Sequence, residues 1–364
     1  MTFVANPKAQ YLSEQSIIDD AISRVLHSGD YVLGREVKRF EKEFSTFIGV
    51  EYGVGTANGT DAVRIALMAL GIKPGDEVIT PSHTAVASVC GIVSAGATPV
   101  FCDVDEDYFT IQPNLIPSLI TTKTKAILVV HIYGQSADLD FIMSIAEDYR
   151  LLVVEDCAQA HGATYNDRRL GSFGNASCFS FYPTKNLGGI GDGGMILTND
   201  SEILEKAKLL RQYGWRENQC SEIIGSNSRL DEIQAAILRA KLPSLVTKNE
   251  ARQKLARLYS ENFLNLPIKI PKERPNCKHS YHLYVIQLQE RDRLMKYLKE
   301  KNIFVAIHYQ APVHKQPAYR KFGSVSNLIN TEKISERIVS LPIYPELSDE
   351  RVKFISKTIE KFFD

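Results

Sequence analysis

LLVVEDCAQAHGA opens the stretch of residues 151–198, which continues through GNASCFSFYPTKNLGGIGDGG and ends in MILT. Residues 151–154 form a short apolar run, which is typical of a strand buried on both faces of a parallel sheet. Ligands of such sheets bind beyond the carboxyl ends of the strands, and Asp156 is expected at that position. A carboxylate there commonly binds a helix N-terminus or a cation, so Asp156 alone does not identify a site.

Lys185 changes this interpretation because of the residues around it. It follows a second apolar run, 178–181, and leads into the glycine-rich sequence NLGGIGDGG. Removing an ammonium from water is costly, so such surroundings lower the pKa of a lysine and make its amine a nucleophile towards aldehydes. Pyridoxal phosphate requires this amine, and a carboxylate to keep its ring nitrogen protonated. The alternative for Lys185 is an ordinary surface lysine.

A phosphate group needs donors, and the sequence Asn58-Gly59-Thr60-Asp61 supplies them upstream. It predicts a helix start with a glycine and a hydroxyl, where free backbone N–H groups face an anion. Taken alone, such a start is more often an ordinary helix cap.

Five segments together resemble one protein family. They are GTANGTDA, PVFCDVD, VVEDCAQAHGA, FSFYPTKNLGGIGDGGM and SNSRLDEIQAAIL, and they are similar to the DegT and StrS family of nucleotide-sugar aminotransferases. The resemblance covers nearly the whole chain. It implies the α/β architecture of fold-type I pyridoxal phosphate enzymes: a large domain with a mainly parallel seven-stranded sheet, expected over residues 1–242, and a smaller C-terminal α/β domain, expected over residues 243–364.

The resemblance also assigns catalytic roles. Lys185 would bind the cofactor and move a proton between the substrate carbon and the cofactor C4' atom; a histidine replaces this lysine in the dehydratase branch of the family. Asp156 would bind the pyridinium nitrogen. Gln159 matches a residue near the cofactor ring oxygen, although a purely structural role stays open.

The remaining cofactor contacts follow from the same comparison. Gly59, Thr60 and Ser180 match the phosphate cradle. Asn227 matches a residue that reaches the partner subunit's site and contacts the phosphate, which implies a homodimer with two shared active sites. From the residues alone, Asn227 would equally be a helix cap.

The segment AIHYQAPVHKQPAY, residues 306–319, resembles the stretch that lines the sugar pocket in members that aminate C3 of the hexose. His308, Tyr309 and His314 are therefore candidate substrate contacts. A histidine in an apolar strand is commonly a core residue instead, and both readings stay open. His131 and His161 also match family positions, and we interpret both as structural.

Two residues depart from the family pattern. Ala85 stands where members commonly have an aromatic residue that stacks on the cofactor ring, and His83 or a partner residue is a possible substitute. Gln310 replaces a common proline after His-Tyr, which weakens the inference about the sugar carbon.

The composition excludes several other classes. The 364 residues carry 43 basic and 43 acidic side chains, so no polyanion partner such as nucleic acid is indicated. No apolar stretch reaches the roughly 18 residues that span a bilayer, and no signal peptide is visible, so we expect a soluble cytoplasmic protein without membrane contacts. Six cysteines without a CxxC pair and eight histidines without ligand spacing predict reduced core residues and no metal site.

The order of elements supports this architecture. After an irregular start, helices are expected from Ser13 and around residues 37–48. Short apolar strands then alternate with helices, which favours a parallel sheet. In the C-terminal part we expect strands at 281–288 and 303–307, and helices at 291–301, 331–339 and 349–363.

The resemblance implies a ping-pong transaminase. L-glutamate would donate the amino group, leaving pyridoxamine 5'-phosphate, and the preferred acceptor is a dTDP-3-keto-6-deoxyhexose, which would give a dTDP-3-amino-3,6-dideoxyhexose. The alternative is C4 amination of a 4-keto-6-deoxyhexose nucleotide. A dinucleotide-binding dehydrogenase would need G-x-G-x-x-G, which GTANGT does not supply. A catalytically inactive regulatory protein is a further alternative, against which Lys185 and Asp156 argue.

Overall fold

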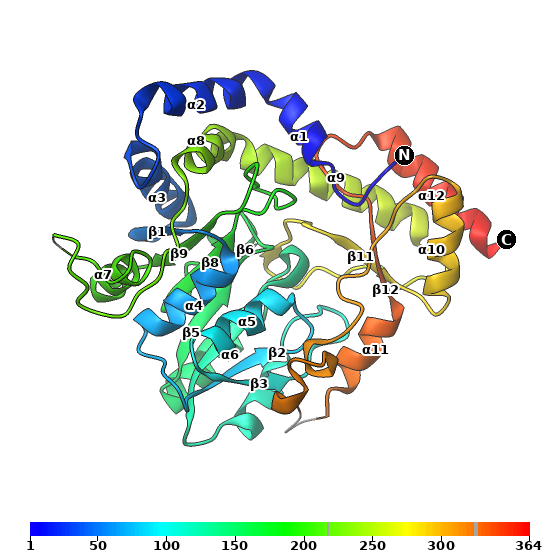
Figure 1. Ribbon diagram of the computed structural model, residues 1–364. Helices are drawn as coiled ribbons and strands as arrows, with labels where there is room; N and C mark the ends of the chain where they lie inside the picture. The colour runs from blue at the N-terminus through cyan, green and yellow to red at the C-terminus, as the bar shows by residue number, and fades with distance from the viewer. Residues whose placement is uncertain (217, 324–326) are drawn as a thin grey trace.

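The computed structural model describes residues 1–216, 218–323 and 327–364, and its central feature is a seven-stranded sheet with the order β1-β9-β8-β5-β4-β2-β3 (Figure 1). The strands are β1 (Tyr52–Thr56), β2 (Glu77–Pro81), β3 (Thr98–Cys102), β4 (Thr124–Val130), β5 (Leu152–Asp156), β8 (Ala176–Ser180) and β9 (Gly194–Thr198). Strands β8, β5, β4, β2 and β3 pair in parallel, whereas β9 is antiparallel to β8 and to β1. The predicted mainly parallel seven-stranded sheet is confirmed.

Helices cover both faces of this sheet. They are α3 (Arg35–Ile48), α4 (Gly59–Ala69), α5 (Val86–Ser94), α6 (Leu139–Tyr149), α7 (Ser201–Leu210) and α8 (Glu232–Lys241). Neighbouring strand residues belong to different core clusters: Val153 packs with α3, α6 and α8, and Val154 packs with α4, α5 and α7. Burial on both faces is the reason why the strand reads as a continuous apolar run.

The chain starts with two helices, α1 (Pro7–Ser13) and α2 (Gln15–Ser28). The expectation of an irregular start is therefore wrong for residues 7–13. The side chain of Asn6 accepts a hydrogen bond from the Ala9 backbone N–H at 3.1 Å, and Pro7 occupies the first helical position. Both features favour a helix start, because they satisfy or remove N–H groups that have no partner within the helix.

The C-terminal part has its own core. It contains α9 (Leu245–Phe263), β11 (Tyr284–Gln287), α10 (Arg291–Glu300), α11 (Ile329–Arg337), β12 (Ile338–Leu341) and α12 (Asp349–Phe363). Strands β11 and β12 form an antiparallel pair, and a cluster of apolar side chains from Leu255 to Ile359 packs around them. Figure 1 shows the long helix α9 passing from the large sheet to this second group of elements. The domain boundary after residue 242 stays a prediction.

Two sequence predictions fail here. Residues 303–307 form no strand but only isolated bridges, from Ile303 to Thr2 and from Ala306 to Ser340. Residues 338–341 form β12, although we expected a helix to continue to residue 339.

Short elements complete the fold. They are β6 (Thr164–Tyr165), β7 (Arg168–Arg169) and β10 (Cys277–Lys278), which form a small antiparallel sheet, and the 3-10 helices η1 (Pro113–Leu119), η2 (Ile132–Gly134), η3 (Leu242–Ser244), η4 (Val313–Lys315) and η5 (Arg320–Phe322). Within the described ranges, no helix combines the length and the apolar character that a membrane crossing requires.

Candidate active site

A cavity of about 240 Å³ lies at the carboxyl ends of β4, β5 and β8, against the start of α4. Six of the predicted site residues line it: Gly59, Thr60, Asp156, Gln159, Ser180 and Lys185. They come from positions up to 126 apart in the sequence, between Gly59 and Lys185. The parallel sheet brings them together, because the ends of its strands meet at one edge.

Asp156 is the last residue of β5, and its side chain is 6% exposed. The Ser88 hydroxyl donates to its Oδ2 atom at 2.7 Å, and the Ala158 backbone N–H donates to Oδ1 at 3.0 Å. A buried carboxylate needs such donors. They hold the group in one orientation at the wall of the cavity.

Lys185 lies in the turn after β8, where its backbone N–H donates to the Tyr182 carbonyl oxygen at 2.8 Å. Burial lowers the pKa of its amine to about 8, while the nearby charge of Asp156 acts in the opposite direction. At pH 7 roughly a tenth of the amine is then neutral, compared with less than about one part in a thousand for an ordinary lysine. A neutral amine is the form that attacks an aldehyde.

The start of α4 lies directly against Ser180 at the wall of the cavity. Asn58 caps the helix by accepting a hydrogen bond from the Asp61 backbone N–H at 2.8 Å. A Cβ atom on Gly59 would lie 2.7 Å from the Cβ atom of Ser180, so a larger residue does not fit without a shift. The result is a narrow cradle of backbone N–H groups and hydroxyls at a helix N-terminus, which suits a phosphate group.

Gln159 also lines the cavity, but its amide is held by protein groups. Its Oε1 atom accepts from the Tyr133 backbone N–H at 2.7 Å, and its Nε2 atom donates to the Tyr309 hydroxyl at 2.9 Å. Gln159 therefore ties the cavity wall to the 306–319 segment of the C-terminal part.

The candidate sugar contacts lie outside the lining of this cavity in the described chain. Tyr309 reaches it only through Gln159. The His308 Nδ1 atom bonds to the Ser340 hydroxyl at 2.8 Å, and burial lowers the pKa of His308 to about 4. His314 points elsewhere: its ring nitrogens contact the Ser82 hydroxyl at 2.7 Å and the Glu332 carboxylate at 3.1 Å.

Asn227 is exposed and does not line the cavity of its own chain. It forms an isolated antiparallel bridge with Gln212. Its predicted contact with a phosphate would have to be made in another subunit.

Ala85 lines the cavity, whereas His83 does not. The Nε2 atom of His83 lies 2.7 Å from the Tyr133 hydroxyl, and its ring packs near Phe109. His83 therefore does not take the place of a stacking aromatic residue in this chain.

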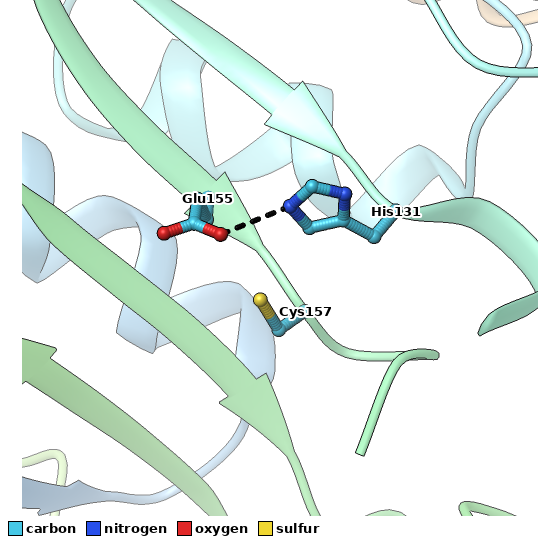
Figure 2. Close-up of side chains that lie close together, drawn as sticks. All are labelled: His131, Glu155 and Cys157. Carbon is cyan, nitrogen blue, oxygen red and sulfur yellow. Dashed lines mark hydrogen bonds and ion pairs between the residues drawn. The ribbon is translucent and has the colours of Figure 1, made fainter. Parts of the chain in front are cut away.

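One group of side chains in the described part of the chain has ligand atoms close enough together to hold a metal ion. It consists of His131, Glu155 and Cys157, whose ligand atoms lie within 4.8 Å of one another (Figure 2). The His131 Nδ1 atom accepts from the Ala137 N–H, so its Nε2 atom carries the proton and donates to Glu155. Glu155 also accepts backbone hydrogen bonds from Gly171, Phe173 and Gly174, each at 2.8 Å.

The hydrogen bonds of these three residues indicate that the group stabilises the fold. Burial opposes ionisation of Glu155, but the hydrogen bond from His131 and the backbone donors outweigh it and lower the pKa of the carboxyl. Burial raises the pKa of the Cys157 thiol well above its usual value, so the thiol stays protonated. A metal ion would have to displace these hydrogen bonds and that proton.

Several cavity residues were missed by the sequence analysis. Ser88 and Thr84 support Asp156, with their hydroxyl oxygens 2.9 Å apart, and Tyr182 and Val130 lie on the wall. A signal existed for Ser88: it lies in the first turn of the helix that follows β2, at the same sheet edge as Asp156.

The fold and the cavity define a pyridoxal phosphate-dependent aminotransferase, since they combine a reactive amine, an opposing carboxylate and a phosphate cradle at one sheet edge. The chain belongs to the DegT/DnrJ/EryC1/StrS aminotransferase family, whose model matches residues 13–360. The predicted family, enzyme class and cofactor are confirmed.

Individual relatives are similar over almost their full length. The dTDP-3-amino-3,6-dideoxy-alpha-D-galactopyranose transaminase of Aneurinibacillus thermoaerophilus is 46% identical over 96% of both chains. A protein of Geobacillus stearothermophilus named pleiotropic regulatory protein is 41% identical, over 97% of this chain and 96% of its own. The crystal structure of S. venezuelae DesV in complex with a ketimine intermediate has a TM-score of 0.97 at 41% identity, over 99% of this chain and 98% of that one.

Proposed function

We propose that this enzyme transfers an amino group from L-glutamate to C3 of a dTDP-3-keto-6-deoxyhexose, which gives a dTDP-3-amino-3,6-dideoxyhexose. The observation that carries the transaminase chemistry is the presence of Lys185 and Asp156 in one cavity next to a phosphate cradle. The choice of C3 and of dTDP is supported by the relative from Aneurinibacillus thermoaerophilus, which is named for that product class. The alternative acceptor is a 4-keto-6-deoxyhexose nucleotide.

Bound pyridoxal phosphate supplies an aldehyde that takes up amines and a ring that draws electrons from the substrate carbon. In this proposal Lys185 would hold the cofactor through its amine and would also be the acid and base that moves the substrate proton. The lowered pKa suits both roles, because the amine can gain and lose a proton near pH 8.

Asp156 would keep the ring nitrogen protonated by forming an ion pair with it. Ser88 and Ala158 orient the carboxylate for this contact. Gly59, Thr60 and Ser180 would donate hydrogen bonds to the phosphate. Gln159 would lie near the ring oxygen.

We propose that His308 and Tyr309 form part of the surface that binds the sugar. His314 would hold the loop that carries these two residues in position. The hydrogen bond between Gln159 and Tyr309 supports this placement, because it joins the cofactor wall to residues 306–319. A hydrogen bond between the His314 ring and the Ser82 hydroxyl joins that segment to the residue that follows β2.

We further propose a homodimer with shared active sites, located in the cytoplasm. Large apolar side chains are exposed around Asn227 and the cavity mouth: Ile224 is 92% exposed, Tyr182 is 52% exposed and Ile190 is 51% exposed. Such large exposed apolar side chains are candidates for burial in an interface. Asn227 would then reach the phosphate of the partner's site.

The test begins with absorbance. The purified enzyme should absorb near roughly 400–430 nm, as expected for an amine bound to the cofactor aldehyde, and the band should shift on addition of L-glutamate. The amine-loaded enzyme is then incubated with 3-keto and 4-keto dTDP-sugars, and the products are identified by NMR. Amination of only the 4-keto sugar would contradict the proposed C3 reaction.

A further inference from the structure

The side chain next to Lys185 is an asparagine with an unusually complete set of partners. Asn186 is 6% exposed. Its Nδ2 atom donates to Asn249 Oδ1 at 2.8 Å and to the Ser280 carbonyl oxygen at 2.9 Å. Its Oδ1 atom lies 3.2 Å from His282 Nδ1. Both of its donors and its acceptor are therefore used.

The chemistry of these partners fixes the orientation of the amide. The Ser280 carbonyl oxygen can only accept, so the group that faces it must be the NH₂ of Asn186. The Oδ1 atom of Asn186 then accepts from His282, which must carry a proton on Nδ1. An amide is thus required at this position, and a carboxylate would face two acceptors.

The partners lie on segments far from residue 186 in the sequence. Asn249 belongs to α9, and its own Nδ2 atom donates to the His161 carbonyl oxygen at 2.8 Å. His161 lies five residues after Asp156, in the loop that follows β5. The path from Asn186 through Asn249 to His161 therefore joins the backbone beside the lysine to the loop beside the carboxylate.

We propose that Asn186 is a positioning residue for Lys185: it holds the lysine turn against α9 and residues 280–282, and thereby fixes the position of the amine in the cavity that Asp156 also lines. The inference rests on the proposed function only in treating Lys185 as the reacting amine. A purely structural role, in which Asn186 stabilises the fold without affecting Lys185, is the competing explanation.

The groups that influence the charge of Lys185 come from several elements. They are Asp156 on β5, His161 in the loop after it, His282 near β11 and His308 in the 306–319 segment. Burial lowers the pKa of His161 to about 3 and that of His308 to about 4, and it lowers the pKa of His282 far below the usual value. All three histidines are neutral at pH 7, which leaves burial and Asp156 to set the state of the amine.

A looser turn would admit water to the amine, and its pKa would rise towards the ordinary value. The experiment measures this directly in the full-length protein after removal of the cofactor. Acetylation of Lys185 is followed by peptide mass spectrometry from pH 6 to pH 10 in the parent protein and in Asn186→Ala. We expect the midpoint of the parent to lie near 8 and that of Asn186→Ala to lie higher by at least about 0.5 pH unit.

Asn330→Ala is the matched control. The Asn330 Nδ2 atom donates to the Val104 carbonyl oxygen at 2.9 Å and also joins the C-terminal part to the large sheet, but away from Lys185. Both variants should lower the melting temperature by a few degrees. Only Asn186→Ala should move the acetylation midpoint and slow the uptake of pyridoxal phosphate, roughly tenfold.

If Asn186→Ala does not fold, Asn249→Ala provides the second variant, because it breaks the same path one bond further from Lys185. A midpoint within about 0.2 unit of the parent in the variant that folds would overturn the inference. Failure of the proposed function gives a different result: the visible band would then persist in Lys185→Ala, whatever happens at Asn186.

Discussion

Lys185 shows how a reactive residue is prepared at the expense of stability. Its amine lies in a cavity where it has lost much of its water, and only the charge of Asp156 opposes the resulting fall in its pKa. A protein that needs only to fold would not place an ammonium there. Sites of this kind commonly carry a stability cost that their function requires.

The first prediction measures that cost. The folded pKa of Lys185, about 8, is below the unfolded value, so the unfolded state binds more protons between these two values. Stability therefore rises with pH in this window, and the penalty is fully present below pH 8. Lys185→Met in the cofactor-free protein should be more stable than the parent at pH 7, by about 1–3 kcal/mol.

Urea unfolding at pH 7 and at pH 9 checks this result. The stability advantage of Lys185→Met should be smaller at pH 9. At that pH the buried amine lowers the free energy of unfolding of the parent by less than it does at pH 7. An advantage of equal size at both pH values would show that packing, and not ionisation, explains the difference.

A second residue-scale prediction concerns the phosphate cradle. Gly59→Ala would place a methyl group 2.7 Å from the Ser180 Cβ atom, so the helix start must move away. We expect the affinity for pyridoxal phosphate to fall at least tenfold, by about 1.4 kcal/mol or more. Ser180→Ala is the control: it removes one hydroxyl without a clash and should cost about 1 kcal/mol.

Equilibrium titration of the cofactor by absorbance or calorimetry gives both numbers. Equal losses in the two variants would argue against the close approach of Gly59 to Ser180 as the feature that shapes the cradle.

At this scale the sequence pattern led to Asp156 and Lys185, and the family resemblance added Gln159 and Ser180; all four line one cavity, while their roles stay predictions. Asp156, Gln159, Ser180 and Lys185 lie close to strand ends, and the topology of a parallel sheet brings strand ends together. The hydrogen bond from Ser88 to Asp156 was missed, because the two residues lie 68 positions apart. The place of Ser88 in the first turn after β2 indicates only the sheet edge that the two residues share, and not the bond between them.

At the scale of elements, the sequence predicted the strands of the large sheet correctly. It failed for two short segments of the C-terminal part. Strands of the large sheet show continuous apolar runs because helices cover both of their faces. Strand β12 directly follows helix α11, and its four residues, all buried, are too few to separate it from the helix by periodicity. Residues 303–307 are as apolar as a strand but find only isolated bridges.

The third prediction tests a connection between elements. Asp103, just after β3, accepts hydrogen bonds from the Asn330 and Thr331 backbone N–H groups at 2.9 and 2.8 Å, and from the Thr331 hydroxyl at 2.7 Å. It thereby satisfies the start of α11 from outside that helix. Asp103→Ala leaves these buried donors unpaired and should lower the free energy of unfolding by about 2–4 kcal/mol.

Asp200→Ala is the comparison, because Asp200 caps α7 within the large domain through the Glu202 and Ile203 backbone N–H groups, at 2.7 and 3.4 Å. That variant should lose less than about 1 kcal/mol. Thermal and urea unfolding decide between the two. Similar losses would mean that Asp103 acts only as an ordinary cap and not as a connection between the two parts of the chain.

At the scale of the molecule, the walls of the cavity are held by residues of both the large sheet and the C-terminal part. The large sheet supplies Lys185 and Asp156, while Gln159 and Asn186 bind residues of the C-terminal part. Two separate hydrogen bonds, from Gln159 to Tyr309 and from Asn186 to Ser280, therefore join the cavity wall to the part of the chain beyond residue 243. The proposed contact of Asn227 with a phosphate would be made in a second copy of the chain, because Asn227 is exposed and does not line the cavity of its own chain.

The last prediction tests that contribution by mixing two inactive proteins. Lys185→Ala lacks the reacting amine. Asn227→Asp would place a carboxylate against the phosphate and should weaken cofactor binding strongly, since like charges repel. If one site takes Lys185 from one subunit and Asn227 from the other, a hybrid dimer has one site with both native residues and one with neither.

Random mixing makes half of the dimers hybrids, and half of their sites are native, so activity should recover to about a quarter of the parent value. The two proteins are unfolded together, refolded and assayed for amino transfer, and size-exclusion chromatography checks the dimer. Each variant refolded alone is the control and should remain inactive. Without recovery in the mixture, Lys185 and Asn227 would have to serve the same site from one chain, because a hybrid then contains no native pair.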